Sequence, residues 1–385
     1  EFLRGKDPLD SYETCDISDM SWSLGYLLMA TGDIQYADMI EKIIFNAAPG
    51  SVTEDFKALQ YFSCGNQVIC DRRSNHNLFY RGDKWMSYRP NPGTECCPGN
   101  VNRAMPNFAS RLWMERERGV YAAALYGPSQ VVLTDRGGRK AVVEEETAYP
   151  FEEGIVFTVH GEEKLDMDLI FRIPGWCAGA VLRFGDASIA GRPGEWLTVR
   201  GPFAEGSKLF LTLPMSPVTR RWGVNGVSVE RGPLVYVLPV EERREIDEEE
   251  EKASEEFPAY NMYPASGFGY GLTEKALSEG LEFHSRIPQG NEWTPGYCPV
   301  WMTVPAVKLP EYQLNRQSEI ESQRPDPPVT RAVFRLEGDY TFTPPLIRPE
   351  EIITADFSRQ ERIRLIPYGA SCLRVTVFPL LGKKD

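Results

Sequence analysis

Apolar residues near the start of the chain recur at the three- and four-residue spacing of helices. Two such patterns lie between positions 11 and 48, and they predict two helices joined by a tight turn. Gly32 stands where a helix C-terminal glycine is common. Asp33, which follows it, is a residue type that caps the start of a helix. The segment is therefore predicted to be a helical hairpin.

The next segment changes from loop-like to helical composition. Residues 49–97 are rich in Gly, Asn, Pro and Arg, which predicts long loops with short strands. Pro98 suits the first turn of a third helix, and apolar positions from Val101 to Trp113 continue that pattern. Pro106 lies inside it and is predicted to kink it.

After Arg118 the pattern becomes short, alternating apolar and polar segments separated by turns, as expected of antiparallel strands. The run 241–256 is dense in Glu, and its self-repulsion favours a solvated linker or an exposed insertion. With 385 residues, two or three domains are expected. The predicted fold is α+β and multidomain, with helical residues 1–118, a β-sandwich at 119–240, an acidic linker or insertion at 241–260 and a β-rich domain at 261–385.

Composition and charge limit the classes of partner. Hydrophobic residues make up 42% of the chain, as in ordinary globular proteins. No apolar run approaches the roughly 20 residues of a membrane-spanning helix, so we expect no membrane partner. A net charge of −13 argues against nucleic-acid binding, which requires clustered Lys and Arg. The first residue is Glu1 and no export signal is recognisable, so we expect residues upstream to be missing.

Eight cysteines include the adjacent pair Cys96 and Cys97. A disulfide between neighbours has poor geometry, and a chain of this size does not need disulfides to fold. The vicinal thiols therefore favour a bound metal or a reducing compartment, which would be the cytoplasm.

A metal-ligand set is assembled from two separate places in the sequence. Glu13 and Cys15 stand at the entry to the first predicted helix, and Cys96 and Cys97 stand just ahead of the third. Three thiolates and one carboxylate suit zinc in tetrahedral coordination, and the helix dipole would stabilise thiolates before Pro98. Buried structural cysteines are the alternative explanation.

The motifs that contain these residues resemble signatures of glycoside hydrolase family 127. TyrGluThrCys at 12–15, followed by the helical segment 32–46, is similar to the first signature, and CysCysProGlyAsn at 96–100 to the second. The strand segment 229–238, ValGluArgGlyProLeuValTyrValLeu, is typical of the family's β domain. ProGly replaces the ProPro of the best-known members after the cysteine pair, which indicates an outlying subgroup.

This resemblance implies a fold and a metal centre. It implies the C-terminal part of an (α/α)6 barrel followed by antiparallel β-sandwich domains, in a β-L-arabinofuranosidase. Carried over from the family, Glu13, Cys15, Cys96 and Cys97 would be zinc ligands, and Cys96 would also be the nucleophile that attacks the anomeric carbon. Most retaining glycosidases use a carboxylate there, and zinc would keep the thiol deprotonated.

The family also has an acid/base glutamate upstream of the Glu-Thr-Cys motif. Glu1 is the candidate here, with a residue further upstream as the alternative and Glu95 in reserve. Tyr61 matches a family tyrosine near the nucleophile, or is a core tyrosine. His76 could contact a sugar hydroxyl or lie in solvent.

Two functions remain open at this stage. The first is a retaining exo-glycosidase acting on β-L-arabinofuranosides or a related plant cell-wall sugar. It could form a homodimer. The 385-residue chain alone is expected to be inactive. The second is a non-catalytic carbohydrate-binding or assembly protein with a structural zinc site. A lyase or epimerase would require a Tyr-His base pair, and the vicinal cysteines argue against it.

Overall fold

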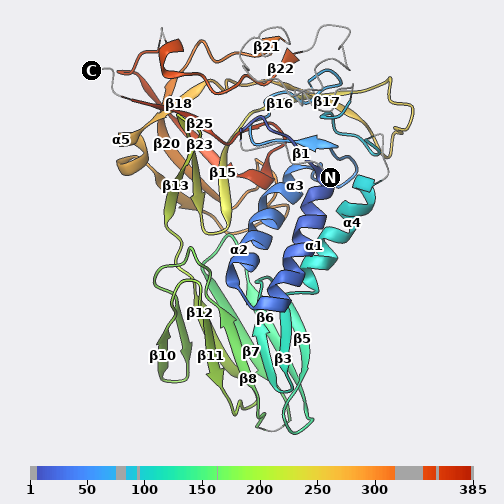
Figure 1. Ribbon diagram of the computed structural model, residues 1–385, viewed down its shortest axis with the longest axis vertical. Coiled ribbons are helices and arrows are strands. Elements are labelled where there is room, and N and C mark those ends of the chain that lie inside the picture. The colour runs from blue at the N-terminus through green and yellow to red at the C-terminus, as the bar shows by residue number, and fades with distance from the viewer. Residues whose placement is uncertain are drawn as a thin grey trace.

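The computed structural model describes residues 7–74, 84–92, 96–162, 164–316, 341–352 and 355–382. Figure 1 shows a group of helices beside two β units, one near each end of the longest axis. The helical elements of the first part are α1 (Thr14–Thr31), α2 (Ile34–Lys42), the π-helical segment η1 (Ile43–Ala47), α3 (Ala48–Gly50) and α4 (Cys96–Ala109).

The predicted helical hairpin is confirmed with both of its caps. Gly32 ends α1 with a φ of 68°, a left-handed conformation that glycine adopts without a steric penalty, and its N–H donates to the carbonyl of Leu28. Asp33 begins α2, and its carboxylate accepts the N–H of Gln35 at 3.0 Å. α4 begins at Cys96 and retains Pro106 inside it, so the third predicted helix is also confirmed.

The helices share one buried cluster. Leu24 and Leu28 of α1 pack with Ile40 of α2 and Ala104 of α4, each at most 4% exposed. Burying a leucine contributes roughly 1.5–3 kcal/mol, so this cluster fixes α1 against α4. The long segment between α3 and α4 is mostly loop, as expected, and its strand β2 (Phe62–Ser63) pairs with β1 (Tyr12–Glu13) just before α1.

Two sheets form the first β unit and enclose a common core. The six-stranded sheet has the order β10-β9-β12-β7-β6-β5, and the four-stranded sheet has the order β11-β8-β4-β3. β4 and β8 are parallel, whereas every other pairing in these two sheets is antiparallel. The strands are β3 (Trp113–Glu117), β4 (Val120–Ala123), β5 (Ser129–Thr134), β6 (Lys140–Thr147), β7 (Gly154–His160), β8 (Asp168–Arg172), β9 (Val181–Phe184), β10 (Ala187–Ala190), β11 (Trp196–Arg200) and β12 (Ser207–Thr212).

The second β unit closes on itself, which differs from the expected sandwich. Its pairings run β14-β25-β18-β20-β23-β15 and return from β15 to β14, so six strands form a ring around the largest buried cluster. Its strands are β13 (Pro217–Trp222), β14 (Gly226–Arg231), β15 (Leu234–Pro239), β18 (Tyr270–Thr273), β19 (Glu282–Ser285), β20 (Val300–Lys308), β23 (Gln360–Pro367), β24 (Arg374–Val375) and β25 (Phe378–Leu381).

This pairing moves the boundary between the β units. The sequence pattern places residues 119–240 in one domain, but β13, β14 and β15 hydrogen-bond to each other and to β23, β24 and β25. The change of unit therefore lies between β12 and β13. Smaller elements complete this part, namely β21 (Asn315–Arg316), β22 (Thr341–Phe342), α5 (Glu274–Glu279), η3 (Pro349–Glu351) and η4 (Tyr368–Ala370).

The acidic run is an insertion and not a linker, and most of residues 248–256 are exposed. It begins in β16 (Glu242–Ile246), which pairs antiparallel with β17 (Tyr260–Pro264). Asp247 and Glu250 are at most 8% exposed, where Arg72 and Arg89 pair with them at 2.8 and 2.7 Å. Arginines from the loop before α4 therefore neutralise two acids of the run, and this explains why the segment folds back onto the protein.

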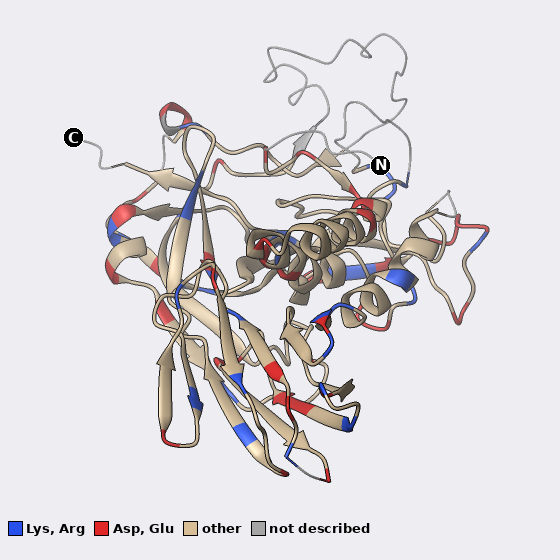
Figure 2. Ribbon diagram, turned by 60° about the horizontal axis from the view of Figure 1, so that its bottom comes forward, with Lys and Arg blue, Asp and Glu red and all other residues tan. Residues whose placement is uncertain are grey.

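Lys and Arg are interspersed with Asp and Glu along the strands and loops of the described part, as Figure 2 shows. No helix in the described ranges combines the length and the apolar composition needed to cross a membrane.

Candidate metal and active site

Four metal-ligating side chains converge where α1 and α4 begin. The ligand atoms of Glu13, Cys15, Cys96 and Cys97 all lie within 4.8 Å of one another. The sulfur atoms of Cys15 and Cys97 are 3.4 Å apart, and that of Cys96 lies 4.0 Å from Cys97 Sγ. Cys96 Sγ is also 3.7 Å from Glu13 Oε1. Three thiols and a carboxylate are donors that zinc accepts, so the group could hold a metal ion.

The backbone around Glu13 is fixed on both sides. Its own N–H donates to the carboxylate of Asp16 at 3.0 Å, which joins the first turn of α1 to the residue that precedes it. The N–H of Thr14 donates to the carbonyl of Tyr61 at 2.9 Å. The carboxylate of Glu13 and the thiol of Cys15 are therefore presented from an ordered turn held by a neighbouring strand.

Cys96 and Cys97 are the first two residues of α4. Both residues therefore lie at the positive end of the helix dipole. Cys97 and Cys15 are fully buried, whereas Cys96 is exposed. The group therefore has a closed side and an open side, and Cys96 is on the open side.

Hydrogen bonding and burial both change the pKa of the Cys15 thiol. The hydrogen bond with Cys97 is the main cause that raises the pKa of Cys15 above its usual range, and burial raises it further. A hydrogen bond with the side chain of Asn100 acts in the opposite direction. A divalent cation also favours the thiolate, because a coordinating thiol is deprotonated.

Asn100 was not selected from the sequence. It is 7% exposed and reaches the Cys15 thiol from the first turn of α4. Its position three residues after Cys97 puts it on the same helix face, and this spacing is the signal that could have identified it.

Tyr61 lies beside the group, where the sequence motif suggested a tyrosine. Burial is the main cause that raises the pKa of Tyr61, and its hydrogen bond with Glu13 adds to this. The phenol therefore stays neutral, and its O–H can donate a hydrogen bond to the carboxylate of Glu13. Its ring packs edge-on against Trp85 at 4.3 Å between centroids.

Three other predicted residues are not tested by the structure. Glu1, His76 and Glu95 lie outside the described residues. All eight cysteines lie in the described ranges, and none of them forms a disulfide bond.

Two family models match the chain. The model for the β-L-arabinofuranosidase GH127 catalytic domain matches residues 5–110, and the model for the GH127 middle domain matches residues 120–215. Together they cover more than half of the sequence. The chain belongs to glycoside hydrolase family 127.

Individual relatives of this family 127 chain are distant. A non-reducing end β-L-arabinofuranosidase from Bifidobacterium longum subsp. longum is 24% identical over 245 residues, which are 58% of this chain and 35% of that protein. A solved structure of a glycoside hydrolase has a TM-score of 0.65 at 19% identity and matches 98% of this chain and 53% of its own.

A GH127 β-L-arabinofuranosidase from Geobacillus stearothermophilus T6 has a TM-score of 0.62 at 20% identity, covering 97% of this chain and 51% of its own. These structures establish a shared fold. The family 127 chain spans about half the length of the solved structures it resembles, and about a third of the curated relative.

Proposed function

We propose that the protein to which this chain belongs is a retaining exo-glycosidase acting on β-L-arabinofuranosides or a related plant cell-wall sugar. The observation that carries this proposal is the convergence of Glu13, Cys15, Cys96 and Cys97 within 4.8 Å. Family membership and the activity named for the Bifidobacterium relative support it. Because the chain spans only part of its relatives, the activity is proposed for the whole protein.

The donor set fits zinc, and the proposed ligands are the same four residues. Four protein ligands fill a tetrahedral zinc site, as they do in structural sites, so a catalytic role requires that one of the four ligands can be reached by a substrate. Glu13, Cys15 and Cys97 are at most 4% exposed, and Cys96 is exposed. This asymmetry favours a catalytic role over a purely structural one. When bound, zinc would supply the positive charge that keeps the nucleophilic thiol deprotonated at neutral pH.

The proposed chemistry has two displacements. In the first, the Cys96 sulfur forms a bond to the anomeric carbon while the bond from that carbon to the leaving oxygen breaks, and a glutamic acid gives its proton to that oxygen. In the second, the same glutamate takes a proton from water, and the water oxygen displaces the sulfur. Glu1 or a glutamate further upstream is the proposed acid/base, and retention of configuration follows from the two inversions.

Tyr61 and the fold complete the proposal. Tyr61 is proposed to bind the substrate beside the nucleophile, where its phenol oxygen can accept a hydrogen bond from a sugar hydroxyl while its O–H is given to Glu13, and His76 is proposed to contact a sugar hydroxyl. We also propose that α1, α2 and α4 belong to an (α/α)6 barrel, which the family resemblance implies.

Metal content and turnover test this function together. Zinc is measured by elemental analysis in the full-length protein and its variants, and hydrolysis is measured with an aryl β-L-arabinofuranoside. Glu13→Ala is expected to lower both. Cys96→Ser is expected to abolish hydrolysis while the protein stays folded. Wild-type protein without zinc would contradict the whole proposal, and hydrolysis by Cys96→Ser would contradict the nucleophile assignment.

The non-catalytic alternative gives a different result in the same assays. A structural zinc site in a carbohydrate-binding protein would retain zinc in the wild type and show no hydrolysis of any aryl furanoside or pyranoside tested. For the 385-residue chain alone we propose zinc binding without turnover, and turnover that disappears in Cys96→Ser would refute that part.

A further inference from the structure

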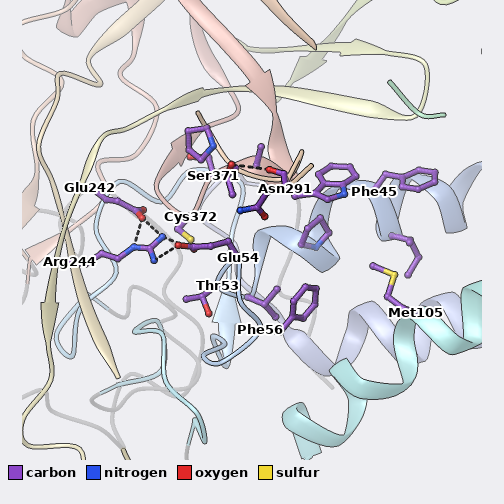
Figure 3. A pocket seen from close by; sticks show the side chains of 18 of the residues that line it. Phe45, Thr53, Glu54, Phe56, Met105, Glu242, Arg244, Asn291, Ser371 and Cys372 are labelled. Atoms are coloured by element: carbon purple, nitrogen blue, oxygen red, sulfur yellow. Dashed lines mark hydrogen bonds and ion pairs between the residues drawn. The ribbon is translucent and has the colours of Figure 1, made fainter. Parts of the chain in front are cut away.

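A cavity with a volume of about 350 Å³ lies where the helices, strand β16 and the second β unit meet. It contains none of the four metal-ligating residues. Its lining divides into a polar side and an aromatic side. Figure 3 shows Glu242, Arg244 and Glu54 on one side, with Phe45 and Met105 on the other.

The polar side is held rigid by one arginine between two acids. Arg244 donates from Nη1 and Nη2 to the two carboxylate oxygens of Glu54, both at 2.9 Å. Its Nε donates to Glu242 Oε1 at 2.5 Å. Because each carboxylate oxygen has two lone pairs, Glu54 can still accept hydrogen bonds from a ligand. Bidentate pairing orients those acceptors before a ligand arrives.

The aromatic side is equally ordered. The rings of Phe45 and Trp293 are nearly parallel, with 7° between their planes and 6.4 Å between their centroids. Phe151 packs against Trp293 at 5.0 Å, which supports the indole from within the protein. Two rings from different parts of the chain thus form one apolar wall.

Strained backbone lies at this same cavity. In the described part of the chain, three non-glycine residues have positive φ, and two of them, Phe56 at 57° and Asn291 at 61°, line the cavity. Phe56 is 61% exposed, so burial of its ring does not explain the strain. A turn holds it, in which its N–H donates to the carbonyl of Thr53 at 2.9 Å. Strain of this kind concentrates at ligand sites.

We infer that this cavity binds one neutral sugar unit, as a carbohydrate site separate from the thiolate group. A sugar has apolar C–H faces that pack on an exposed ring such as Phe56, and hydroxyls that donate to carboxylates such as Glu54. Two carboxylates against one guanidinium disfavour an anionic ligand. A wholly apolar ligand would remove water from the ion pair and would offer no hydrogen bonds in exchange.

The cavity lies close to residues that support the thiolate group. Phe56 and Met105 also line a small cleft that includes Thr14 and Asn100. A glycan held at the cavity would therefore be retained near the proposed catalytic centre. The inference goes beyond the proposed function, and sugar binding at this cavity does not require hydrolysis.

Ligand-observed NMR titration of the 385-residue chain, for which no turnover is proposed, tests the inference with methyl β-L-arabinofuranoside and L-arabinose as probes. Phe56→Gly removes the exposed ring and also relieves the positive φ, so the variant is expected to fold at least as well as wild type. Glu54→Gln keeps the shape of the side chain and removes its charge. Each variant is expected to bind the probes about tenfold more weakly. Galacturonic acid, an anionic sugar, is expected not to bind here.

Phe210→Ala is the matched control, because Phe210 is 39% exposed on β12 and does not line the cavity. It is expected to leave probe binding unchanged. If Cys96→Ser abolishes binding while Phe56→Gly and Glu54→Gln do not, the sugar lies at the thiolate group and the inference is wrong, although the proposed function stands. Absence of binding by wild type at millimolar probe also overturns it. If binding depends on Phe56 while the full-length protein has neither zinc nor turnover, the cavity is supported and only the proposed function is contradicted.

Discussion

The sulfur atoms of Cys15 and Cys97 lie 3.4 Å apart in the interior, although 82 positions separate the two residues in the sequence. Two thiolates at that distance repel each other unless a cation lies between them. Zinc removal by a strong chelator is therefore expected to lower the thermal unfolding midpoint by about 5 °C or more. Cys15→Ala is expected to lose zinc and to show little further change with chelator, as measured by calorimetry and elemental analysis.

Cys298→Ala is the control for this experiment. Cys298 is also fully buried, but its thiol donates to the carbonyl of Val300 in the second β unit, away from the metal-ligating group. This variant should keep zinc and the chelator response of the wild type. A wild-type midpoint that is insensitive to complete zinc removal would show that the group contributes nothing to stability through a metal.

Tyr61→Phe removes the hydroxyl and keeps the ring, so it tests the role of the hydroxyl alone. The ring packs against Trp85 and Phe62, and phenylalanine keeps those contacts, so the variant is expected to fold and to retain zinc. The hydrogen bond with Glu13 is lost, and such bonds to charged groups are worth about 1.5–3 kcal/mol. In the full-length protein, kcat/KM for an aryl arabinofuranoside should fall about ten- to hundredfold. Unchanged kcat/KM would make Tyr61 a core tyrosine.

Local signals were sufficient for the helices, and they also pointed to the four side chains that converge at the candidate metal site. Gly32 and Asp33 are helix caps, whose effect is confined to one turn, and the structure uses both as predicted. The two cysteine motifs are also local, because each lies at the first turn of a helix. Their meeting depends on α1 packing on α4, which the sequence alone suggested only through the family resemblance.

Non-local pairing explains what the sequence did not indicate. The ring of strands closes because β14 bonds to both β15 and β25, and β25 begins about 150 residues further along the chain than β14 ends. Alternation along one strand carries no information about its partner. Similarly, the acidic run gives no sign that Arg89 lies opposite Glu250.

The buried carboxyl group of Glu145 is expected to make the stability of the protein depend on pH. Burial raises the pKa of Glu145 from its ordinary 4.5 to about 8, although the N–H of Gly127 and the hydroxyl of Ser129 donate to its carboxylate. Between about pH 4.5 and 8 the folded state keeps a proton that the unfolded state has lost, so stability falls as the pH rises through this window. The contribution is at most about 1.4 kcal/mol per pH unit.

Glu145→Gln should remove this dependence, because the amide cannot ionise. Urea unfolding at several values between pH 5 and 8.5 is expected to show a flatter slope for the variant, and a stability gap over wild type that widens with pH. Parallel slopes for the two proteins would mean that Glu145 does not titrate in this window.

The pair Glu41 and Arg172 joins α2 to β8, and both side chains have no exposed surface. Tyr149 also donates its hydroxyl to Glu41 at 2.5 Å. Glu41→Ala takes one of two acidic partners from the buried guanidinium and leaves Asp38 as the other, which is expected to cost up to about 3–5 kcal/mol in urea unfolding. The double variant Glu41→Met with Arg172→Met buries no charge at these positions and should be less destabilised than the single one. Arg136→Ala, which removes a surface pair with Asp166, should cost at most about 1 kcal/mol. If the double variant is as unstable as Glu41→Ala, the loss comes from packing between the helices and the first β unit and not from the unpaired charge.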